Sequence, residues 1–470
     1  MDKHLTIVGG GLAGTEAAWQ AAKLGIRVSL YEMRPEITTP AHVSKQLAEL
    51  VCSNSLGSNL ANKAGGLLKA ELRGFDSLIL ACAEETAIPA GSSLAVDREL
   101  FAEKVTSKIE QHPEITLVRK EVREIPESAC IIATGPLTSS SLADAIGRLS
   151  GEKFLYFYDA LSPIVSSNSI DMEFAYRASR YNKGTEAEGD YINCPMTKDQ
   201  YDVFFEALIS AEQISLRDFE QEDANFFEGC LPVEVMAKRN KDTLRFGPMR
   251  PVGLADPKTG NRPYAVLQLR QDDIAETLYN IVGFQTNLRW GEQRRVLRMV
   301  PGLENAEFMR YGMMHRNTYI HSPELLQPTM QYRGRADLLF AGQIVGVEGY
   351  MGNAASGLVA GINAARLLNG DHPVIFPTNT MIGALCHYVT HADSKSFQPM
   401  KANFGLLPMP ENRMKKAERY QYYSRRALTR MRRFARQRRL NYDSQAAESI
   451  MDSATDPVIT GEVDPMRMPG

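Results

Sequence analysis

The first 35 residues alternate between short apolar runs and a segment of helical composition. Residues 5–8 form an apolar run typical of a buried parallel strand, residues 15–23 have helical composition, and residues 27–31 form a second apolar run. A glycine-rich stretch separates the first run from the helical segment. The pattern predicts a β-strand, α-helix, β-strand unit at the start of the chain.

The same rhythm continues along the chain and returns near its end. Residues 97–111 are predicted to form a helix with an acidic residue at its N-cap, and residues 116–118 and 130–133 are predicted to be strands. Residues 338–341 have the pattern of another buried strand, and residues 353–368 form a helix of small residues. These elements are predicted to join one doubly wound sheet.

The middle of the chain lacks this rhythm. It is rich in Tyr, Phe, Gln and charged residues, and Pro and Gly interrupt it repeatedly. We therefore expect an α/β fold in which a Rossmann-like FAD-binding domain is split in sequence by an inserted α+β domain. The first domain takes residues 1–180 and 311–410, and the inserted domain takes residues 181–310 and is expected to bind substrate.

The last 60 residues are divided into two parts by their charge pattern. Residues 411–440 carry apolar side chains at near-helical spacing with Arg and Lys between them, which predicts a basic amphipathic helix. Residues 441–470 are polar, acidic and interrupted by Pro and Gly, so we expect a mobile tail there. The apolar positions of the predicted helix are Met414, Ala417, Tyr420, Ala427, Met431 and Phe434.

Composition restricts the partners and the compartment. The formal charge is only −3, so a nucleic-acid site has to be a local basic patch. The six cysteines show neither paired spacing nor the density of a secreted disulfide scaffold, which indicates the reducing cytoplasm. No run of about 18 apolar residues is present and no leader pattern precedes the first strand, so neither membrane insertion nor secretion is expected.

The turn after the first predicted strand fits the pattern GxGxxG. Glycines there permit a tight turn and let backbone N–H groups approach a pyrophosphate at the start of the following helix. Glu32 closes the second strand about 20 positions later, where a carboxylate is suited to bind a ribose hydroxyl. Together these features predict dinucleotide binding, and a purely structural turn is the alternative. The turn consists of Gly9, Gly10, Gly11, Leu12, Ala13 and Gly14.

A second glycine-rich region favours FAD over NAD as the dinucleotide. Gly342 and Gln343 follow the strand at 338–341, and Gly349 and Tyr350 precede the helix of small residues. The positive end of that helix is expected to face the flavin and to stabilise its anionic reduced form. Gly135, after the strand at 130–133, is predicted to contact the same cofactor.

Two of the cysteines have polar, glycine-rich neighbours. Cys52 lies in the sequence LVCSNS and Cys230 in FEGCLP, and thiols in such loops can act as nucleophiles when partly exposed. From the residues alone, a buried inert thiol is the alternative for either one. Cys82, Cys130 and Cys194 have the surroundings of structural cysteines.

Two further groups are candidates for binding. Arg289 and Arg294 flank Trp290, a combination that suits RNA phosphates and a stacked base, although a solvated helix face is the alternative. His387 and His391 have helical metal-ligand spacing, but no third or fourth ligand is near them in the sequence. We therefore expect no metal site.

Several local sequences are specific: YEMRP at 31–35, AELVCSNS at 48–55, TLRFGPM at 243–249, VGFQT at 282–286, WGEQ at 290–293 and MHRNT at 314–318. Over residues 1 to 405 the chain resembles the folate- and FAD-dependent tRNA (uracil-5-)-methyltransferases, the TrmFO family. Its departures are Met351, Gly352 and Asn353, where the family usually has Glu-Ser, and the segment after about Glu411.

The resemblance implies a reaction and assigns roles. Methylenetetrahydrofolate supplies the carbon, FAD relays it through N5, and NAD(P)H supplies the electrons, giving 5-methyluridine at position 54 in the T-loop of tRNA. By the same resemblance, Cys230 attacks C6 of the uracil and Cys52 acts near the flavin as a general base or gate. The target base must leave its stack, and Trp290 and Tyr350 are candidate stacking partners for base or pterin.

Three other functions compete with this interpretation. The same chemistry on a ribosomal RNA uridine is not distinguished by the sequence. A flavin oxidoreductase acting on a small molecule predicts turnover without RNA. A non-catalytic RNA-binding flavoprotein predicts that Cys230→Ala changes nothing.

Overall fold

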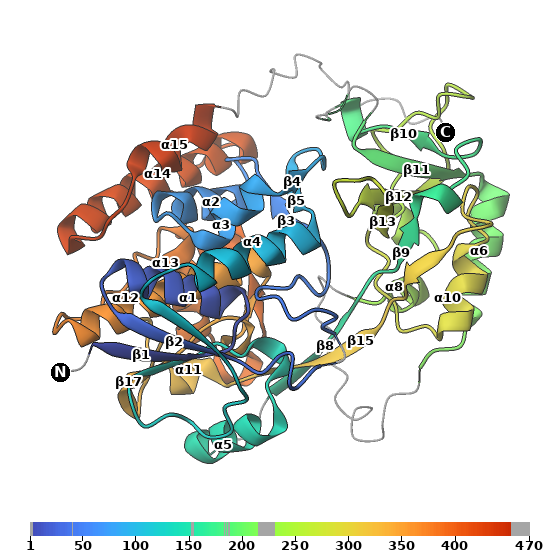
Figure 1. Cartoon of the computed structure of the whole chain (residues 1–470). Helices are drawn as coiled ribbons and strands as arrows, with labels where there is room; N and C mark the ends of the chain where they lie inside the picture. The colour runs from blue at the N-terminus through green and yellow to red at the C-terminus, as the bar shows by residue number, and fades with distance from the viewer. Residues whose placement is uncertain are drawn as a thin grey trace.

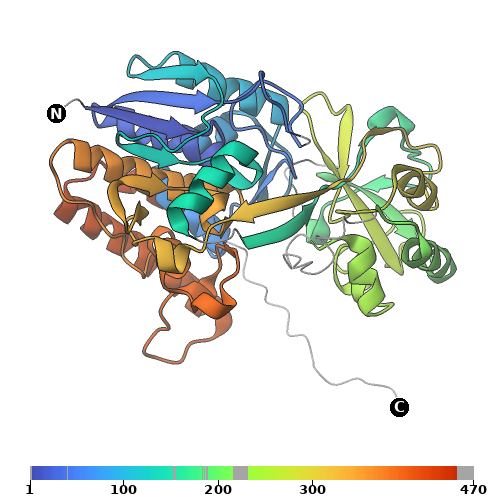
Figure 2. The ribbon, with the colours of Figure 1, turned by 90° about the horizontal axis from the view of Figure 1, so that it is seen from below.

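The chain forms two lobes joined by a pair of long strands (Figure 1). The structure is a computed structural model and describes residues 3–39, 41–151, 155–182, 184, 186, 189–214 and 231–452. Strand β8 (Leu155–Ala160) leaves the first lobe and β15 (Met314–Tyr319) returns to it, and the two pair antiparallel. Figure 2 shows the same two strands crossing between the lobes.

The first lobe is built on a six-stranded sheet in the order β16-β17-β7-β1-β2-β6. All neighbours pair parallel except β16 with β17. Because β17 follows the inserted lobe yet pairs with β7, the two halves of the split domain meet in one sheet, which confirms the predicted fold class. The strands are β1 (His4–Val8), β2 (Arg27–Glu32), β6 (Ile115–Arg119), β7 (Cys130–Ile132), β16 (Gln331–Tyr332) and β17 (Arg335–Phe340).

Helices α1 (Leu12–Lys23) and α12 (Tyr350–Leu368) pack closely beside this sheet. A Cβ atom at Gly357 would lie 2.2 Å from the carbonyl oxygen of Ala13, and one at Gly361 would lie 2.4 Å from that of Ala17. Two glycines one turn apart therefore let the helix backbones touch. The lobe also contains α2 (Ala64–Gly74), α3 (Leu78–Glu85), α4 (Arg98–Glu110), α5 (Ser140–Ser150), α11 (Ser322–Leu325), α13 (Met381–His391) and a small sheet of β3 (Ser55–Ser58), β4 (Ala87–Ile88) and β5 (Ser93–Val96).

The second lobe is an antiparallel sheet in the order β10-β11-β12-β13-β9-β14 with its own hydrophobic core. Its strands begin at Ile164, whereas the sequence placed the boundary at residue 181. The apolar runs before residue 181 resemble strands of the first lobe, so composition did not reveal the change of sheet. The elements are β9 (Ile164–Ser166), β10 (Tyr176–Arg177), β11 (Tyr191–Met196), β12 (Ala265–Gln271), β13 (Leu278–Ile281), β14 (Phe308–Arg310), α6 (Lys198–Ser210), α8 (Val233–Arg239), α9 (Thr243–Phe246) and α10 (Trp290–Leu297).

The C-terminal segment differs partly from its prediction. Helix α14 (Lys416–Arg438) buries Ala427, Met431 and Phe434 and exposes arginines on its outer side. The expected mobile tail at 441–470 is wrong for its first part, because α15 (Ser444–Asp452) packs against α2. The ring of Tyr442 lies 4.8 Å from that of Phe75, over a glycine at position 74. Residues 453–470 lie outside the described part of the chain.

Within the described residues, none of the helices has both the length and the apolar character needed to cross a bilayer.

Candidate active site

The glycine turn lies at the carboxyl ends of the parallel strands and forms one wall of a pocket of about 1000 Å³. A Cβ atom at Gly14 would lie 1.8 Å from the carbonyl oxygen of Gly9, and Gly9 itself has φ of +108° with Ala133 close by. Only glycine fits these two positions. A Cβ atom at Gly11, by contrast, would meet no protein atom within 4 Å and would face the open pocket.

The structure brings most of the predicted cofactor residues together around this pocket. Two of them do not line it: Gly14 packs under the turn, and Gly349 lines a neighbouring pocket. The predicted residues in its wall are Gly9, Gly10, Gly11, Leu12, Ala13, Glu32, Gly135, Gly342, Gln343 and Tyr350.

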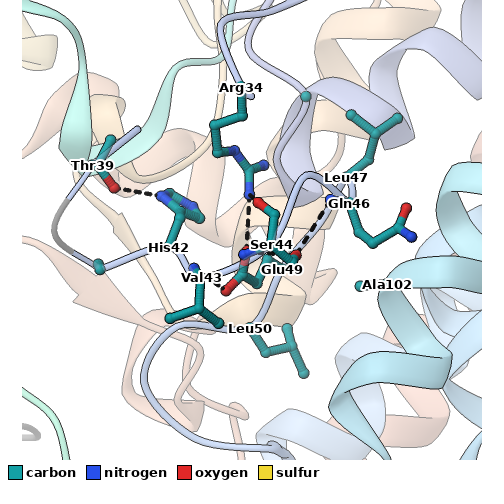
Figure 3. Close-up of polar contacts among 12 residues, drawn as sticks. Arg34, Thr39, His42, Val43, Ser44, Gln46, Leu47, Glu49, Leu50 and Ala102 are labelled. Atoms are coloured by element: carbon teal, nitrogen blue, oxygen red, sulfur yellow. Dashed lines mark hydrogen bonds and ion pairs between the residues drawn. The ribbon is translucent and has the colours of Figure 1, made fainter. Parts of the chain in front are cut away.

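Glu32 is held in the pocket wall by a buried network. Its carboxylate accepts hydrogen bonds from the N–H groups of Gly10 and Arg34 and from Nε of Arg34, each 3.0 Å long. Arg34 also donates to Glu49 over 3.0 Å (Figure 3). Burial alone would raise the pKa of Glu32, but the Arg34 guanidinium and the hydrogen bonds hold it below the ordinary value. The carboxylate is therefore charged and fixed in place.

Asn353 is a pocket residue that the sequence did not identify as part of the site. It lies in the first turn of α12, lines both pockets, and its buried Oδ1 atom has no hydrogen-bond partner within the described chain. A buried side-chain amide normally makes hydrogen bonds, so this atom points to a bound polar ligand. Arg34 and Glu49 were also missed, although both lie in the family-specific sequences. Only their contacts reveal that they support Glu32.

A second pocket, of about 1460 Å³, adjoins the first and lies between the two lobes. The first lobe contributes Cys52 and Gly349, and the inserted lobe contributes Gln285. Tyr350 and Asn353 line both pockets. The predicted thiol therefore lies beside the junction of the two pockets.

The loop that carries Cys52 is attached to Tyr350. The backbone N–H groups of Cys52 and Ser53 donate to the Tyr350 hydroxyl over 2.9 and 3.0 Å. Burial raises the pKa of Tyr350, so the phenol stays protonated at neutral pH. Cys52 is half-buried, as a thiol that meets a ligand must be.

Cys230, the predicted nucleophile, lies outside the described residues. The segment that follows it is anchored at the second pocket, because Val233 N–H donates to the Gln285 carbonyl over 2.7 Å. The buried carboxylate of Glu234 accepts from the Thr286 hydroxyl at 2.8 Å and from Asn287 N–H at 2.7 Å. Gln285 lines the pocket that contains Cys52.

The other described cysteines are buried in the protein. Burial raises the pKa of each of their thiols to about 12, so they are poor nucleophiles at neutral pH. These cysteines are Cys82, Cys130, Cys194 and Cys386.

The two histidines of α13 stack on each other instead of converging on a ligand. The rings of His387 and His391 lie 4.2 Å apart and nearly parallel. No group of three or more His, Cys, Asp or Glu side chains suited to hold a metal ion occurs in the described parts of the chain.

Trp290 ends a stack of three aromatic rings on the inserted lobe. It is 54% exposed and stacks on Tyr311, which stacks on Phe308, with ring centroids 5.5 and 5.4 Å apart. Arg294 donates to the Tyr311 hydroxyl over 2.7 Å, so the structure brings it to the stack. Arg289 instead forms an ion pair with Glu212 at 3.0 Å.

The split parallel sheet, the glycine turn and the adjoining pocket define the class as an α/β protein with the fold of FAD-dependent oxidoreductases. A family described as "Glucose inhibited division protein A" matches residues 4–372. The chain belongs to the TrmFO family within this class. It is 58% identical over 429 residues to the methylenetetrahydrofolate--tRNA-(uracil-5-)-methyltransferase TrmFO of Enterococcus faecalis, covering 91% of this chain and 98% of that protein.

Two other similarities agree with this assignment. The TrmFO of Bacillus subtilis is 59% identical over 425 residues, covering 90% of this chain and 97% of the relative. The solved structure of Aquifex aeolicus GidA in the form I crystal has a TM-score of 0.68 at 17% identity, covering 96% of this chain and 78% of that chain. At this identity the GidA structure supports the fold alone.

Proposed function

We propose that this chain transfers the one-carbon unit of methylenetetrahydrofolate to carbon 5 of the T-loop uridine of tRNA. The observation that carries the proposal is the position of Cys52 beside the junction of a dinucleotide pocket and an interdomain pocket, in a chain of the TrmFO family. The first pocket suits the cofactor, and the second suits the substrates. A cytoplasmic location follows from the RNA substrate.

The first pocket fits FAD. The glycine turn gives a pyrophosphate access to backbone N–H groups at the start of α1, and Oε2 of Glu32, which accepts one hydrogen bond from the protein, has room for a ribose hydroxyl. Asn353 lines both pockets, and its buried Oδ1, which has no hydrogen-bond partner in the described chain, suits a polar group of the flavin ring. When bound, FAD would supply one-carbon transfer and electron storage.

Cys230 is the proposed nucleophile toward uracil. Addition of its thiolate to C6 forms an S–C bond and makes C5 electron-rich, so that C5 can bond to the one-carbon unit. Loss of the C5 proton and of the thiolate then restores the ring. Two electrons from NAD(P)H, delivered as hydride, complete the methyl group as the bond between its carbon and the carrier nitrogen breaks. Cys52 lies in the second pocket, where it can serve as the base that accepts the C5 proton.

Trp290 and Arg294 are proposed to bind the RNA. We expect Trp290→Ala to raise KM for tRNA about tenfold, because base stacking on an aromatic ring contributes about 1–3 kcal/mol. Trp290→Phe should restore most of the affinity, and kcat should change little. Steady-state kinetics with tRNA as the varied substrate measures this, and an unchanged KM in the alanine variant would remove Trp290 from the interface.

Helix α14 offers a second surface for phosphates. Its outer side carries Arg425, Arg432 and Arg436, and no ion pair of these three side chains occurs within the described residues. We expect the triple change to Gln to weaken tRNA binding and to reduce the slope of log K against log salt by up to about 3, since each lost phosphate contact reduces it by about 0.9. Binding titrations from 50 to 200 mM salt test this expectation, and an unchanged slope refutes it.

The substrate class is tested by supplying RNA from cells that lack 5-methyluridine. With NAD(P)H and methylenetetrahydrofolate present, mass spectrometry of the digested nucleosides should find 5-methyluridine in the tRNA fraction. If 5-methyluridine appeared only in the ribosomal RNA fraction, the reaction would be the proposed one but its substrate would be ribosomal RNA. Consumption of NAD(P)H without any RNA product would favour a small-molecule oxidoreductase, and no turnover of either kind would favour a non-catalytic flavoprotein.

A further inference from the structure

The loop that carries Cys52 is held from both lobes. Besides the contact of Cys52 and Ser53 with Tyr350, the loop accepts hydrogen bonds from one arginine of each lobe: Arg98 at the start of α4, and Arg270 in β12 of the inserted lobe. These contacts involve residues on both sides of the cysteine. They therefore restrain the residues next to the thiol, and do not only join the two lobes.

Arg270 binds the two residues that follow Cys52. Its Nε donates to Oδ1 of Asn54 over 2.8 Å, and its Nη2 donates to the hydroxyl of Ser53 over 2.7 Å. Asn54 is fully buried, and its Nδ2 donates to the carbonyls of Val96 at 3.1 Å and Gln271 at 2.9 Å. A side chain of the first lobe is thus bound by both side chain and backbone of the inserted lobe.

Arg98 makes the reciprocal contact. Its guanidinium binds both carboxylate oxygens of Asp272, just after β12, at 3.0 to 3.1 Å. The remaining Nη1 donates to the carbonyl of Leu50 over 2.9 Å. The bidentate geometry fixes both position and orientation. Leu50, Ser53 and Asn54 therefore bracket Cys52 with contacts that depend on the inserted lobe.

The burial of Arg270 shows that these contacts are specific. The residue is only 7% exposed, and burial lowers the pKa of its guanidinium, so the surroundings disfavour the charge. A buried charge requires well-placed hydrogen bonds, and Arg270 donates to the side chains of Ser53 and Asn54. A shift of either lobe would break them.

We propose that Arg270 is a positioning residue for Cys52, and that docking of the inserted lobe sets the place of the thiol in the interdomain pocket. The same lobe binds RNA in the proposed function, on which the catalytic part of this inference rests. The loop after β13 also brings Gln285 to the pocket, where its carbonyl accepts from Val233 N–H. The inserted lobe thus contacts the Cys52 loop and contributes a residue to the same pocket.

The test compares Arg270→Met with Arg270→Lys and with a control, Arg177→Met. Arg177 lies in β10 and binds Tyr279 and Glu276, both within the inserted lobe. We expect Arg270→Met to lower kcat on the order of 100-fold, because a displacement of about 1 Å in a reacting group has that effect. KM for tRNA should change much less, Arg270→Lys should recover only part of kcat, and Arg177→Met should leave it unchanged.

A second readout does not depend on turnover. Alkylation of native protein by iodoacetamide, followed by mass spectrometry of the Cys52 peptide, should be at least about fivefold faster in Arg270→Met, because local opening becomes easier by about 1 kcal/mol. The control should label at the wild-type rate. Equal labelling rates in the wild type, Arg270→Met and Arg177→Met, or an unchanged kcat in Arg270→Met, would overturn the proposal. If the wild type itself transferred no carbon, the proposed function would fail while the labelling still tested the positioning.

Ser53→Ala is a milder variant that tests the same contact if Arg270→Met does not fold. It removes the acceptor of Nη2 and of the Ser55 N–H but leaves the contact of Arg270 with Asn54, so a smaller loss of kcat is expected than in Arg270→Met. In the double variant the two effects should be less than additive, because both changes break one contact. Additive losses would mean that Arg270 does not act through this loop.

Discussion

Replacing Cys230 with alanine is expected to abolish carbon transfer to tRNA while leaving the bound flavin in place. Without the thiolate, C5 of uracil is not activated, and removal of a nucleophile commonly lowers kcat by about 10⁴-fold or more. Formation of 5-methyluridine, measured by mass spectrometry, should fall below detection. The flavin absorbance of the purified variant should match that of the wild type.

Cys82→Ala is the matched control for this variant. Cys82 is buried in α3, outside the linings of both pockets, so its loss should leave the turnover rate close to wild type. If Cys230→Ala retained substantial methyl transfer, Cys230 would not be the nucleophile. Cys52→Ala would then be the next variant to measure.

Two alanine substitutions in the glycine turn are expected to change different quantities, the FAD affinity in one variant and the free energy of unfolding in the other. In Gly11→Ala the new methyl group meets no protein atom within 4 Å, so the free energy of unfolding of the apoprotein should not change. The methyl group would occupy space in the pocket, so FAD affinity should fall on the order of 100-fold, which is about 2.7 kcal/mol. Equilibrium binding of FAD to the apoprotein measures this effect.

Gly9→Ala should instead destabilise the protein itself. Its Cβ would lie 2.4 Å from the Ala133 carbonyl oxygen at a φ of +108°, which is strained for any L side chain. We expect the free energy of unfolding to fall by about 2–4 kcal/mol, from strain and overpacking together. Denaturant unfolding of the apoproteins separates the two variants. Equal stability of Gly9→Ala and wild type would contradict the geometry of the turn.

Local sequence signals predicted the elements around the dinucleotide pocket well. The predicted strand at 27–31 is β2, and the predicted helix at 97–111 is α4, with Asp97 capping it through the N–H groups of Glu99 and Leu100. Such signals act within a few residues and do not depend on tertiary contacts. Where an element forms because of tertiary packing, the sequence did not predict it. Helix α15 is short and polar, yet it is held against α2 by Ala447, which is fully buried.

Some residues of the candidate site were likewise predicted from the sequence, and others were not. The glycine turn and Glu32 were predicted because their chemistry depends on local backbone geometry. Arg270 was not, because its importance comes from partners that are distant in the sequence. Arg270 and Asn54, for example, are separated by 216 positions. A single sequence contains no signal for such a pair.

The carbon of the methyl group in 5-methyluridine is expected to come from the folate. The most direct measurement supplies methylenetetrahydrofolate labelled at its methylene carbon, with FAD, NAD(P)H and undermodified tRNA, and then locates the label after nuclease digestion. We expect label in the methyl group of the T-loop uridine with the wild-type protein and none with Cys230→Ala. Unlabelled 5-methyluridine, or label confined to other products, would contradict it.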